Sequence, residues 1–229
     1  MNKKKRNRLL GLLIIMVAAG VFGVHWYAQK QSAKDGESQQ GISVYHVDSV
    51  QPIAQKRGEA HGGASSTSSQ LTGKGVTMIG DSVTVGVAPY LKEQMPDITV
   101  DGKVGRQMSQ AGKVLRELAA QGNLGDRVII ELGTNGPFSK DQLRSVLQTL
   151  SNAKQVLLVT TRVPRGWQDT VNDTMEQTAS EFKNVQVVDW YAASQGKDQF
   201  FYKDGIHLKP DGSRYYTSLL VQALNKKDR

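Results

Sequence analysis

Three short polar segments carry the side chains of this chain that could do chemistry. Gly80-Asp81-Ser82 follows the apolar run 76–79, Gly133-Thr134-Asn135 follows the apolar run 128–132, and Asp204-Gly205-Ile206-His207 lies near the C-terminus. A serine at a strand-to-helix turn can expose its hydroxyl and aim its backbone N–H at a bound carbonyl, as nucleophilic acyl transfer requires. Serine after a strand is also a favoured helix N-cap, so the first segment alone leaves both roles open.

A serine nucleophile needs a base, and His207 is the one candidate beyond residue 72. The other three histidines are His25, His46 and His61. Asp204 precedes His207 by three residues, a spacing that brings a carboxylate beside the imidazole, where it can orient the ring and stabilise the imidazolium. Asp189, after the apolar run 185–188, is the alternative acid. We expect Asp204 to fill the role.

Acyl transfer also needs hydrogen-bond donors where negative charge develops on the carbonyl oxygen. Asn135 can offer its side-chain amide, and the Ser82 N–H can act as a second donor. Gly105 follows another apolar run and lacks a Cβ, so its N–H can approach a ligand closely. Thr-Asn-Gly is also ordinary turn chemistry, and a turn role for Gly105 is equally compatible with the sequence.

From residue 74 onward, short apolar runs rich in β-branched residues alternate with amphipathic stretches. The predicted strands are 76–79, 98–100, 128–132, 156–160 and 185–188, and the predicted helices are 83–95, 109–121, 140–150, 167–182 and 210–224. This alternation predicts a parallel sheet covered by helices on both faces. Reactive groups of such sheets lie at the carboxyl ends of strands, so Ser82 and Asn135 should meet in space.

The N-terminal part has a different composition. Residues 1–8 carry a charge of +5, and residues 9–28 contain no Lys, Arg, Asp or Glu. Twenty residues of helix span about 30 Å, the thickness of a bilayer core. We expect a single transmembrane anchor with a cytoplasmic N-terminus and the remainder outside the cell. The alternative is a cleaved signal peptide with its apolar region at residues 9–19, which would give a secreted protein.

The rest of the composition excludes several classes. Residues 73–229 hold 20 basic and 17 acidic residues, a net charge of only +3, so the high pI does not indicate nucleic-acid binding. The chain has no cysteine, which removes disulfides, thiolate catalysis, lipidation and Cys-based metal sites. We expect no metal and no cofactor.

Residues 29–72 are rich in Gln, Ser, Gly and Lys and read as a flexible tether between the anchor and a domain at 73–229. Within the tether, residues 42–47 alternate like a strand. They could pair with an edge of the domain or do nothing, and we expect no role for them.

Four segments in this order, Gly80-Asp81-Ser82, Gly105, Gly133-Thr134-Asn135 and Asp204-x-x-His207, resemble the motif blocks of the SGNH (GDSL-type) serine hydrolases. The resemblance covers residues 74 to 225. It implies an α/β fold with three α/β/α layers, flavodoxin-like, and a triad of Ser82, Asp204 and His207. It also implies Ser82, Gly105 and Asn135 as the oxyanion hole. Gly136 departs from the acidic residue that many members have after the block Asn, which points to a subgroup.

That subgroup is similar to the extracellular C-terminal domain of OatA-type peptidoglycan O-acetyltransferases. The segments 131–136, 162–167 and 204–208 carry the similarity. It implies a cell-wall glycan as substrate, with the side chains of Arg162, Arg165, Trp167 and Asn172 as candidates for the acceptor groove. In those proteins a multi-span acyltransferase supplies acetyl groups from within the membrane. With one expected span, this chain would need a separate membrane donor protein or none.

Three functions remain open on these residues. The first is a membrane-tethered peptidoglycan O-acetyltransferase that works through an acetyl-enzyme, and the second is an O-acetyl carbohydrate esterase that uses the same residues. The third is a non-catalytic glycan-binding module, against which the intact Ser82, Asp204 and His207 argue. A lipase or thioesterase would need an apolar acyl tunnel, and no distinctive apolar loop in the sequence predicts one.

Overall fold

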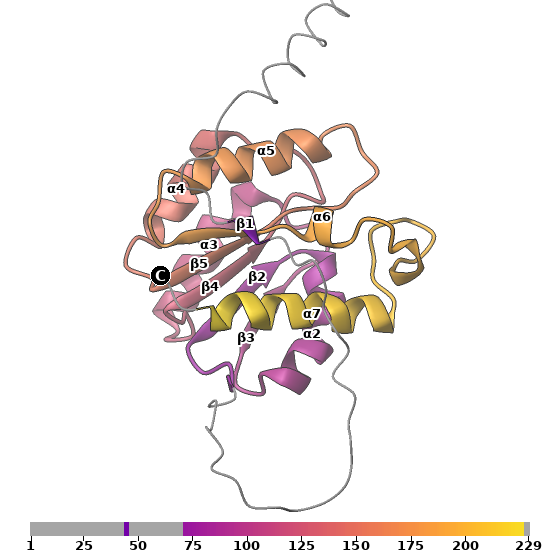
Figure 1. Cartoon of the computed structure of the whole chain (residues 1–229). Helices are drawn as coiled ribbons and strands as arrows, with labels where there is room; N and C mark the ends of the chain where they lie inside the picture. The colour runs from indigo at the N-terminus through magenta and orange to yellow at the C-terminus, as the bar shows by residue number, and fades with distance from the viewer. Residues whose placement is uncertain (1–43, 46–70, 227–229) are drawn as a thin grey trace, which may run out of the picture. The chain divides into compact units, whose positions relative to one another are not determined.

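The computed structural model describes residues 44–45 and 71–226 (Figure 1). The strands are β1 (Val44–Tyr45), β2 (Val76–Gly80), β3 (Thr99–Gly102), β4 (Arg127–Glu131), β5 (Gln155–Val159) and β6 (Val185–Val188). The helices are α2 (Ser82–Gln94), α3 (Met108–Ala120), α4 (Lys140–Thr149), α5 (Gln168–Ala179), α6 (Trp190–Ala193) and α7 (Pro210–Asn225), with a 3-10 turn, η1, at Asp198–Phe200.

All strands pair in parallel in the order β1-β6-β5-β4-β2-β3. The chain moves outward from β2 to β3 and then returns to place β4 on the other side of β2. Strand order therefore reverses between β2 and β4, and ligands of open α/β sheets bind at such a switch point, beyond the carboxyl ends of the strands. The register aligns the last residues of the three strands there, Gly80 with Gly102 and with Glu131.

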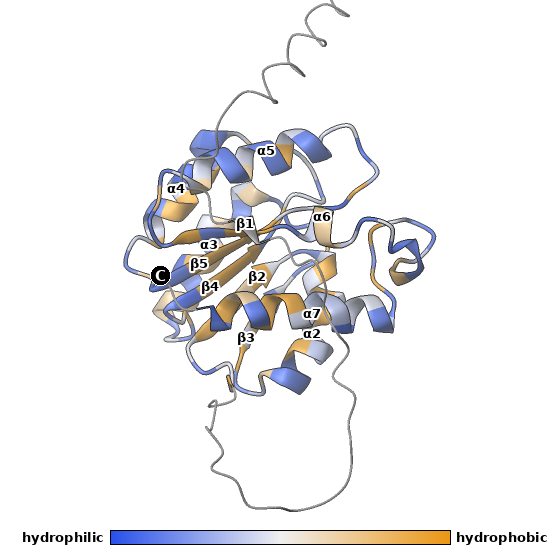
Figure 2. Ribbon diagram, viewed as in Figure 1, coloured by the Kyte–Doolittle hydropathy of each residue, from blue (hydrophilic) through white to orange (hydrophobic). Residues whose placement is uncertain are grey.

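Helices cover both faces of the sheet, so the molecule has three layers and two apolar cores. One core packs α3, α4 and α5 on one face, and the other packs α2, α6 and α7 on the opposite face. Neighbouring strand residues enter opposite cores, as Val128 and Ile130 do on one side and Ile129 on the other. Figure 2 shows the central strands as the most continuous apolar feature. Strands buried on both faces are apolar throughout, which is why they stood out in the sequence.

The five predicted strands and five predicted helices are confirmed, with ends that differ from the prediction by at most three residues. Ser139 and Gln142 form a capping box at the start of α4, and Pro210 lies in the first turn of α7. The short α6 and η1 were not predicted, because neither is long enough to show a helical period.

Two expectations about the N-terminal residues have different outcomes. Residues 42–47 were expected to have no role, and this is wrong, because Val44 and Tyr45 pair in parallel with Val187 and Val188 at the edge of the sheet. The expected anchor at 9–28 lies outside the described residues. Within the described part, no helix combines the length and apolarity that a membrane crossing requires.

The close approach of α2 to β2 depends on Gly80. A Cβ at Gly80 would lie 1.9 Å from the Thr84 hydroxyl and 2.8 Å from the Glu131 carbonyl oxygen. We expect Gly80→Ala to lower the free energy of unfolding by about 1–3 kcal/mol or more, because one of the contacting atoms is backbone and cannot move aside cheaply.

Gly86 on the outer side of α2 is the matched control, since a Cβ there would meet nothing within 4 Å. Gly86→Ala should stabilise the helix by roughly 0.5–1 kcal/mol. Urea unfolding of both variants measures the difference. Equal stability of the two variants would contradict the close packing at Gly80.

Candidate active site

A tight hairpin after η1 presents the predicted acid and base. Phe201 and Leu208 form an antiparallel bridge, the Tyr202 N–H donates to the His207 carbonyl at 2.9 Å, and the Lys209 N–H donates to the Phe200 carbonyl at 2.8 Å. One carboxylate oxygen of Asp204 accepts the backbone N–H groups two and three residues further on, at 2.9 and 3.0 Å. Asp204 thus builds the turn that carries His207.

The other carboxylate oxygen of Asp204 lies 2.8 Å from His207 Nδ1, and His207 Nε2 lies 3.0 Å from Ser82 Oγ. Burial acts to raise the pKa of Asp204, but the hydrogen bonds from the His207 ring and the turn amides outweigh it and lower that pKa. An ionised Asp204 has no proton to give, so Nδ1 is the donor and Nε2 is free to accept the serine proton. The three side chains therefore form the continuous chain that activates a serine.

Asp189, the alternative acid, does not contact His207. It is buried at the end of β6, and one of its carboxylate oxygens accepts from the Ala192 N–H and the Thr160 hydroxyl. It therefore caps α6, whereas Asp204 is the acid in contact with His207.

The first turn of α2 leaves one backbone amide for a ligand. The first amides of a helix have no partner within the helix. Here Asp81 Oδ1 accepts from the Val83 N–H at 3.0 Å, and Glu131 Oε2 accepts from the N–H groups of Asp81 at 3.3 Å and Thr84 at 3.2 Å. The Ser82 N–H between them has no partner among residues 71–226. It is the amide that can donate to an oxyanion.

The two other predicted donors lie on neighbouring loops. Asn135 follows β4, and its side-chain nitrogen donates to Asp81 Oδ2 at 3.0 Å and approaches the Arg106 carbonyl at 3.4 Å. The bond to Asp81 fixes the plane of the amide beside Ser82. Gly105 follows β3 and has a φ of 76°, a conformation that suits glycine, and its N–H has no partner in the described part of the chain.

Arg106, which the sequence did not single out, ties the Gly105 loop to the nucleophile strand. Its side chain is 5% exposed and donates to the Gly80 carbonyl at 3.0 Å and to the Asp101 carboxylate at 2.6 Å. The Arg106 guanidinium is therefore fully engaged by partners inside the domain. Its effect is to hold the ends of β2 and β3 and the loop after β3 in one arrangement.

The sequence also gave no role to Asp81 and Glu131, which form a buried carboxyl pair behind Ser82. Their side chains hydrogen-bond to each other. Burial raises the pKa of Asp81, and burial followed by the charge of Asp81 raises the pKa of Glu131 well above its ordinary value. A glutamate that ends an apolar strand without a cation beside it was the available sign of such a group.

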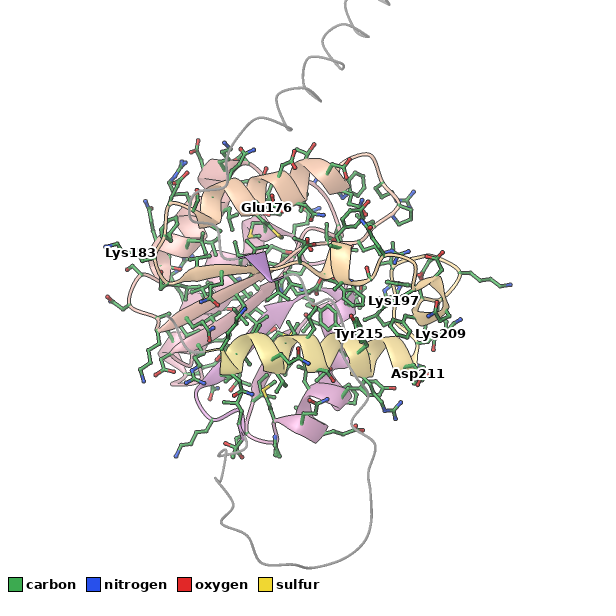
Figure 3. The ribbon with its side chains drawn as sticks, in the orientation of Figure 1. Glu176, Lys183, Lys197, Lys209, Asp211 and Tyr215 are labelled. Carbon is green, nitrogen blue, oxygen red and sulfur yellow. The ribbon has the colours of Figure 1, made fainter. Side chains whose placement is uncertain are left out.

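Arg162, which was expected to bind substrate, contacts the segment that leads to the hairpin, and we call this set of contacts the Arg162 clamp. Its guanidinium donates to the Ser194 carbonyl and the Asp198 carboxylate and lies 4.2 Å from the centre of the Phe201 ring. Lys197 and Tyr215 add a second contact, with the Lys197 ammonium 5.5 Å from the centre of the Tyr215 ring on α7 (Figure 3).

The other three residues that were expected to bind substrate lie in three different environments. Asn172 is buried, and its amide donates to and accepts from the Thr161 backbone. Trp167 is half-buried, and its indole N–H donates to the Gly133 carbonyl at 3.2 Å. Arg165 is exposed, with no ion pair or hydrogen bond of its side chain to any described residue. It remains the freest candidate for a substrate contact.

Across 71–226, no group of three or more His, Asp or Glu side chains could hold a metal ion. The arrangement described above can perform covalent acyl transfer with side chains and backbone amides alone.

The comparisons with known proteins agree with this chemistry. No family model matches the chain. The chain is 47% identical over 148 residues to the peptidoglycan O-acetyltransferase OatA of Listeria monocytogenes, a match that covers 65% of this chain and 24% of the relative. It is 40% identical over 156 residues to the O-acetyltransferase OatA of Staphylococcus aureus, covering 66% of this chain and 26% of the relative. The chain thus spans about a quarter of the length of these curated relatives.

A solved structure shows the same fold. The C-terminal catalytic domain of Streptococcus pneumoniae peptidoglycan O-acetyltransferase A, with a methylsulfonyl adduct, is 20% identical with a TM-score of 0.59. The match covers 67% of this chain and 93% of that domain. The homologues of this chain are therefore peptidoglycan O-acetyltransferases of the OatA type, and the resemblance stated from the motifs is confirmed.

The Arg162 clamp leads to a prediction about the hairpin. Arg162→Ala should lower kcat for a small ester by about tenfold or more, since a small displacement of a catalytic group has large effects on rate. KM for the small ester should change little, because the Arg162 guanidinium is engaged by Ser194, Asp198 and Phe201. Steady-state kinetics with an aryl acetate measure both quantities.

Arg165→Ala is the matched control, because Arg165 is a neighbouring arginine without internal partners. It should leave kcat for the small ester near the wild-type value. If both variants lose kcat equally, or if neither does, the clamp is not what holds the hairpin.

Proposed function

We propose that this chain, whose homologues are peptidoglycan O-acetyltransferases, is an extracytoplasmic serine acyl-transfer enzyme that acts on acetyl esters of cell-wall carbohydrate. The observation that carries the proposal is the continuous hydrogen-bond chain from Asp204 through His207 to Ser82 Oγ. It ends beside a backbone amide that has no partner in the described part of the chain. Ser82, His207 and Asp204 are the proposed triad, within the SGNH-type, flavodoxin-like fold that the motifs imply.

The first half-reaction loads the enzyme. Ser82 Oγ attacks the acetyl carbonyl while His207 Nε2 takes its proton, and Asp204 stabilises the imidazolium that results. The carbonyl oxygen becomes an oxyanion held by the N–H groups of Ser82 and Gly105 and by the Asn135 amide. When the intermediate collapses, the alcohol leaves with the proton from His207, and the acetyl group remains on Ser82.

The second half-reaction decides the product. A sugar hydroxyl that gives its proton to His207 and attacks the acetyl-enzyme yields an O-acetylated glycan, whereas water yields free acetate. The similarity to O-acetyltransferases favours the sugar. An O-acetyl carbohydrate esterase with the same residues is the second candidate function.

The proposed acceptor groove uses Arg165 and the exposed part of Trp167. Arg165 can pair with carboxylates of a wall glycan, and an indole face can stack on a sugar ring. Pro164 brings this loop to the hairpin, since a Cβ at Gly205 would lie 3.8 Å from its ring. An acceptor held there would lie beside His207.

The membrane part of the proposal rests on sequence outside the described residues. An anchor at 9–28 with a tether at 29–72 would hold the domain at the outer face of the cell membrane. A multi-span membrane protein that delivers acetyl groups is the proposed partner. Cleavage of the N-terminal segment would give a secreted enzyme with the same chemistry.

Replacement of the nucleophile tests the proposal. Ser82→Ala should reduce ester turnover by about 10⁴-fold or more while the domain remains folded, because the triad acts as a unit. Ser109→Ala, at an exposed serine on α3, is the control. Phenol release from an aryl acetate should be followed together with acetate transfer to chitooligosaccharide or muropeptide acceptors.

Each outcome assigns a function. Ser82-dependent acetylated sugar identifies a transferase, and Ser82-dependent free acetate alone identifies an esterase. Glycan binding that survives Ser82→Ala without any turnover identifies a non-catalytic binding module. A loss of less than about tenfold would remove Ser82 as the nucleophile.

The pH dependence tests the base. A histidine base must be unprotonated, and histidine side chains ordinarily titrate between pH 5 and 8. The lowered pKa of Asp204 keeps its carboxylate ionised across this range, so Asp204 does not contribute to a loss there. We expect Ser82-dependent turnover to fall as pH is lowered from 8 to 5. A flat profile, after subtraction of the rate of Ser82→Ala, would exclude His207 as the base.

A further inference from the structure

Glu131 lies where the carboxyl end of β4 meets the first turn of α2. It is 5% exposed, and its Oε2 atom accepts three hydrogen bonds, from the N–H groups of Asp81 and Thr84 and from the Thr84 hydroxyl at 2.9 Å. Two of the three donors are backbone amides on either side of the nucleophile. Glu131 therefore sets the position of the turn that carries Ser82.

Glu131 and Asp81 cannot both be ionised in this arrangement. Two carboxyl groups that hydrogen-bond to each other must share a proton. No Lys or Arg among residues 71–226 forms an ion pair with either group, since Arg106 is directed to Gly80 and Asp101.

The partners indicate which carboxyl carries the proton. Each oxygen of Asp81 accepts an N–H, Oδ1 from Val83 and Oδ2 from the Asn135 amide. Within residues 71–226 Glu131 accepts through Oε2, which leaves its Oε1 atom to carry the proton. Burial and the neighbouring charge of Asp81 raise its pKa well above the ordinary range.

We propose that Glu131 is a positioning residue that acts in its neutral form. Its Oε2 atom takes the amides of Asp81 and Thr84, and its O–H donates to Asp81. The Ser82 N–H is then the amide left for the oxyanion, and Asp81 is free to aim the Asn135 amide. The inference rests on the proposed acyl-transfer function and adds a residue that neither the triad nor the oxyanion hole contains.

The neutral state matters because of where the new charge appears. The oxyanion develops beside Ser82, on the turn whose other amides donate to the two carboxyl groups. A second negative charge in a buried, low-dielectric site would oppose that oxyanion more strongly than the same charge would in water. A protonated Glu131 supplies the same acceptor oxygen without that cost.

Two substitutions separate a neutral acid from an ionised one. Glutamine keeps the acceptor oxygen for the two amides and replaces the O–H by an N–H that can donate to Asp81. Leucine has a similar volume and offers neither. In the full-length chain, we expect Glu131→Leu to lower kcat for an aryl acetate about 10²-fold with KM nearly unchanged, as for loss of one oxyanion donor. Glu131→Gln should rescue most of that loss.

The pH dependence of stability tests the proton without reference to activity. A carboxyl whose pKa is higher in the folded state than in the unfolded state stabilises the fold at low pH and loses that contribution as pH rises. Glutamine cannot ionise, so Glu131→Gln should gain in Tm relative to wild type as pH rises from 5 to 8. Asp81 and Tyr216 are the other titratable groups that interact with Glu131, and they are present in both wild type and Glu131→Gln.

Each result has a definite meaning. A Glu131→Gln variant as inactive as Glu131→Leu, or a Tm difference that does not change with pH, would overturn the neutral positioning role. If Glu131→Leu does not fold, the kcat of Glu131→Gln and the Tm comparison still decide the question. Absence of Ser82-dependent turnover in wild type would refute the acyl-transfer function, and with it the positioning of an oxyanion donor. The Tm comparison would then report only whether Glu131 is neutral.

Discussion

The site depends on how the amides at the start of α2 are satisfied. A buried helix start needs partners for its free N–H groups, yet acyl transfer needs one of them to remain available. Asp81 and Glu131 meet both requirements by taking the amides around Ser82 and leaving that of Ser82 itself. The partner Glu131 is available because β4 pairs with β2 in the register that aligns it with Gly80.

The acid and base are held in a different way. Asp204 and His207 lie on a partly exposed hairpin, where burial contributes little to their placement. Order there comes from the turn that Asp204 builds with its own backbone, from the bridge of Phe201 to Leu208, and from the contacts of Arg162. Buried contacts thus hold the turn of Ser82, whereas the position of His207 depends on the local contacts of a partly exposed hairpin.

The similarity to O-acetyltransferases covers about two thirds of this chain and about a quarter of the length of those relatives. The chemistry of the domain can be argued from its own residues, because the proposed triad and the proposed oxyanion donors come from the described part of the chain. Transfer and hydrolysis share every residue up to the acetyl-enzyme and differ only in what approaches His207 next.

The sequence by itself determined the layered architecture of this fold and the candidate residues of its site. Apolar runs such as 128–132 are local signals, and the alternation of strand and helix leaves few ways to bury them, so the sheet and the order of its helices were predictable. The prediction that Ser82 and Asn135 meet followed from the same rule.

The roles of Arg162, Asn172 and Glu131 did not follow from the sequence. Their partners lie between 11 and 50 residues away in the sequence, as Thr161, Asp198, Asp81 and Thr84 do. Strand register and loop packing decide such contacts, because a hydrogen bond depends on distances of a few tenths of an ångström that only the tertiary structure sets.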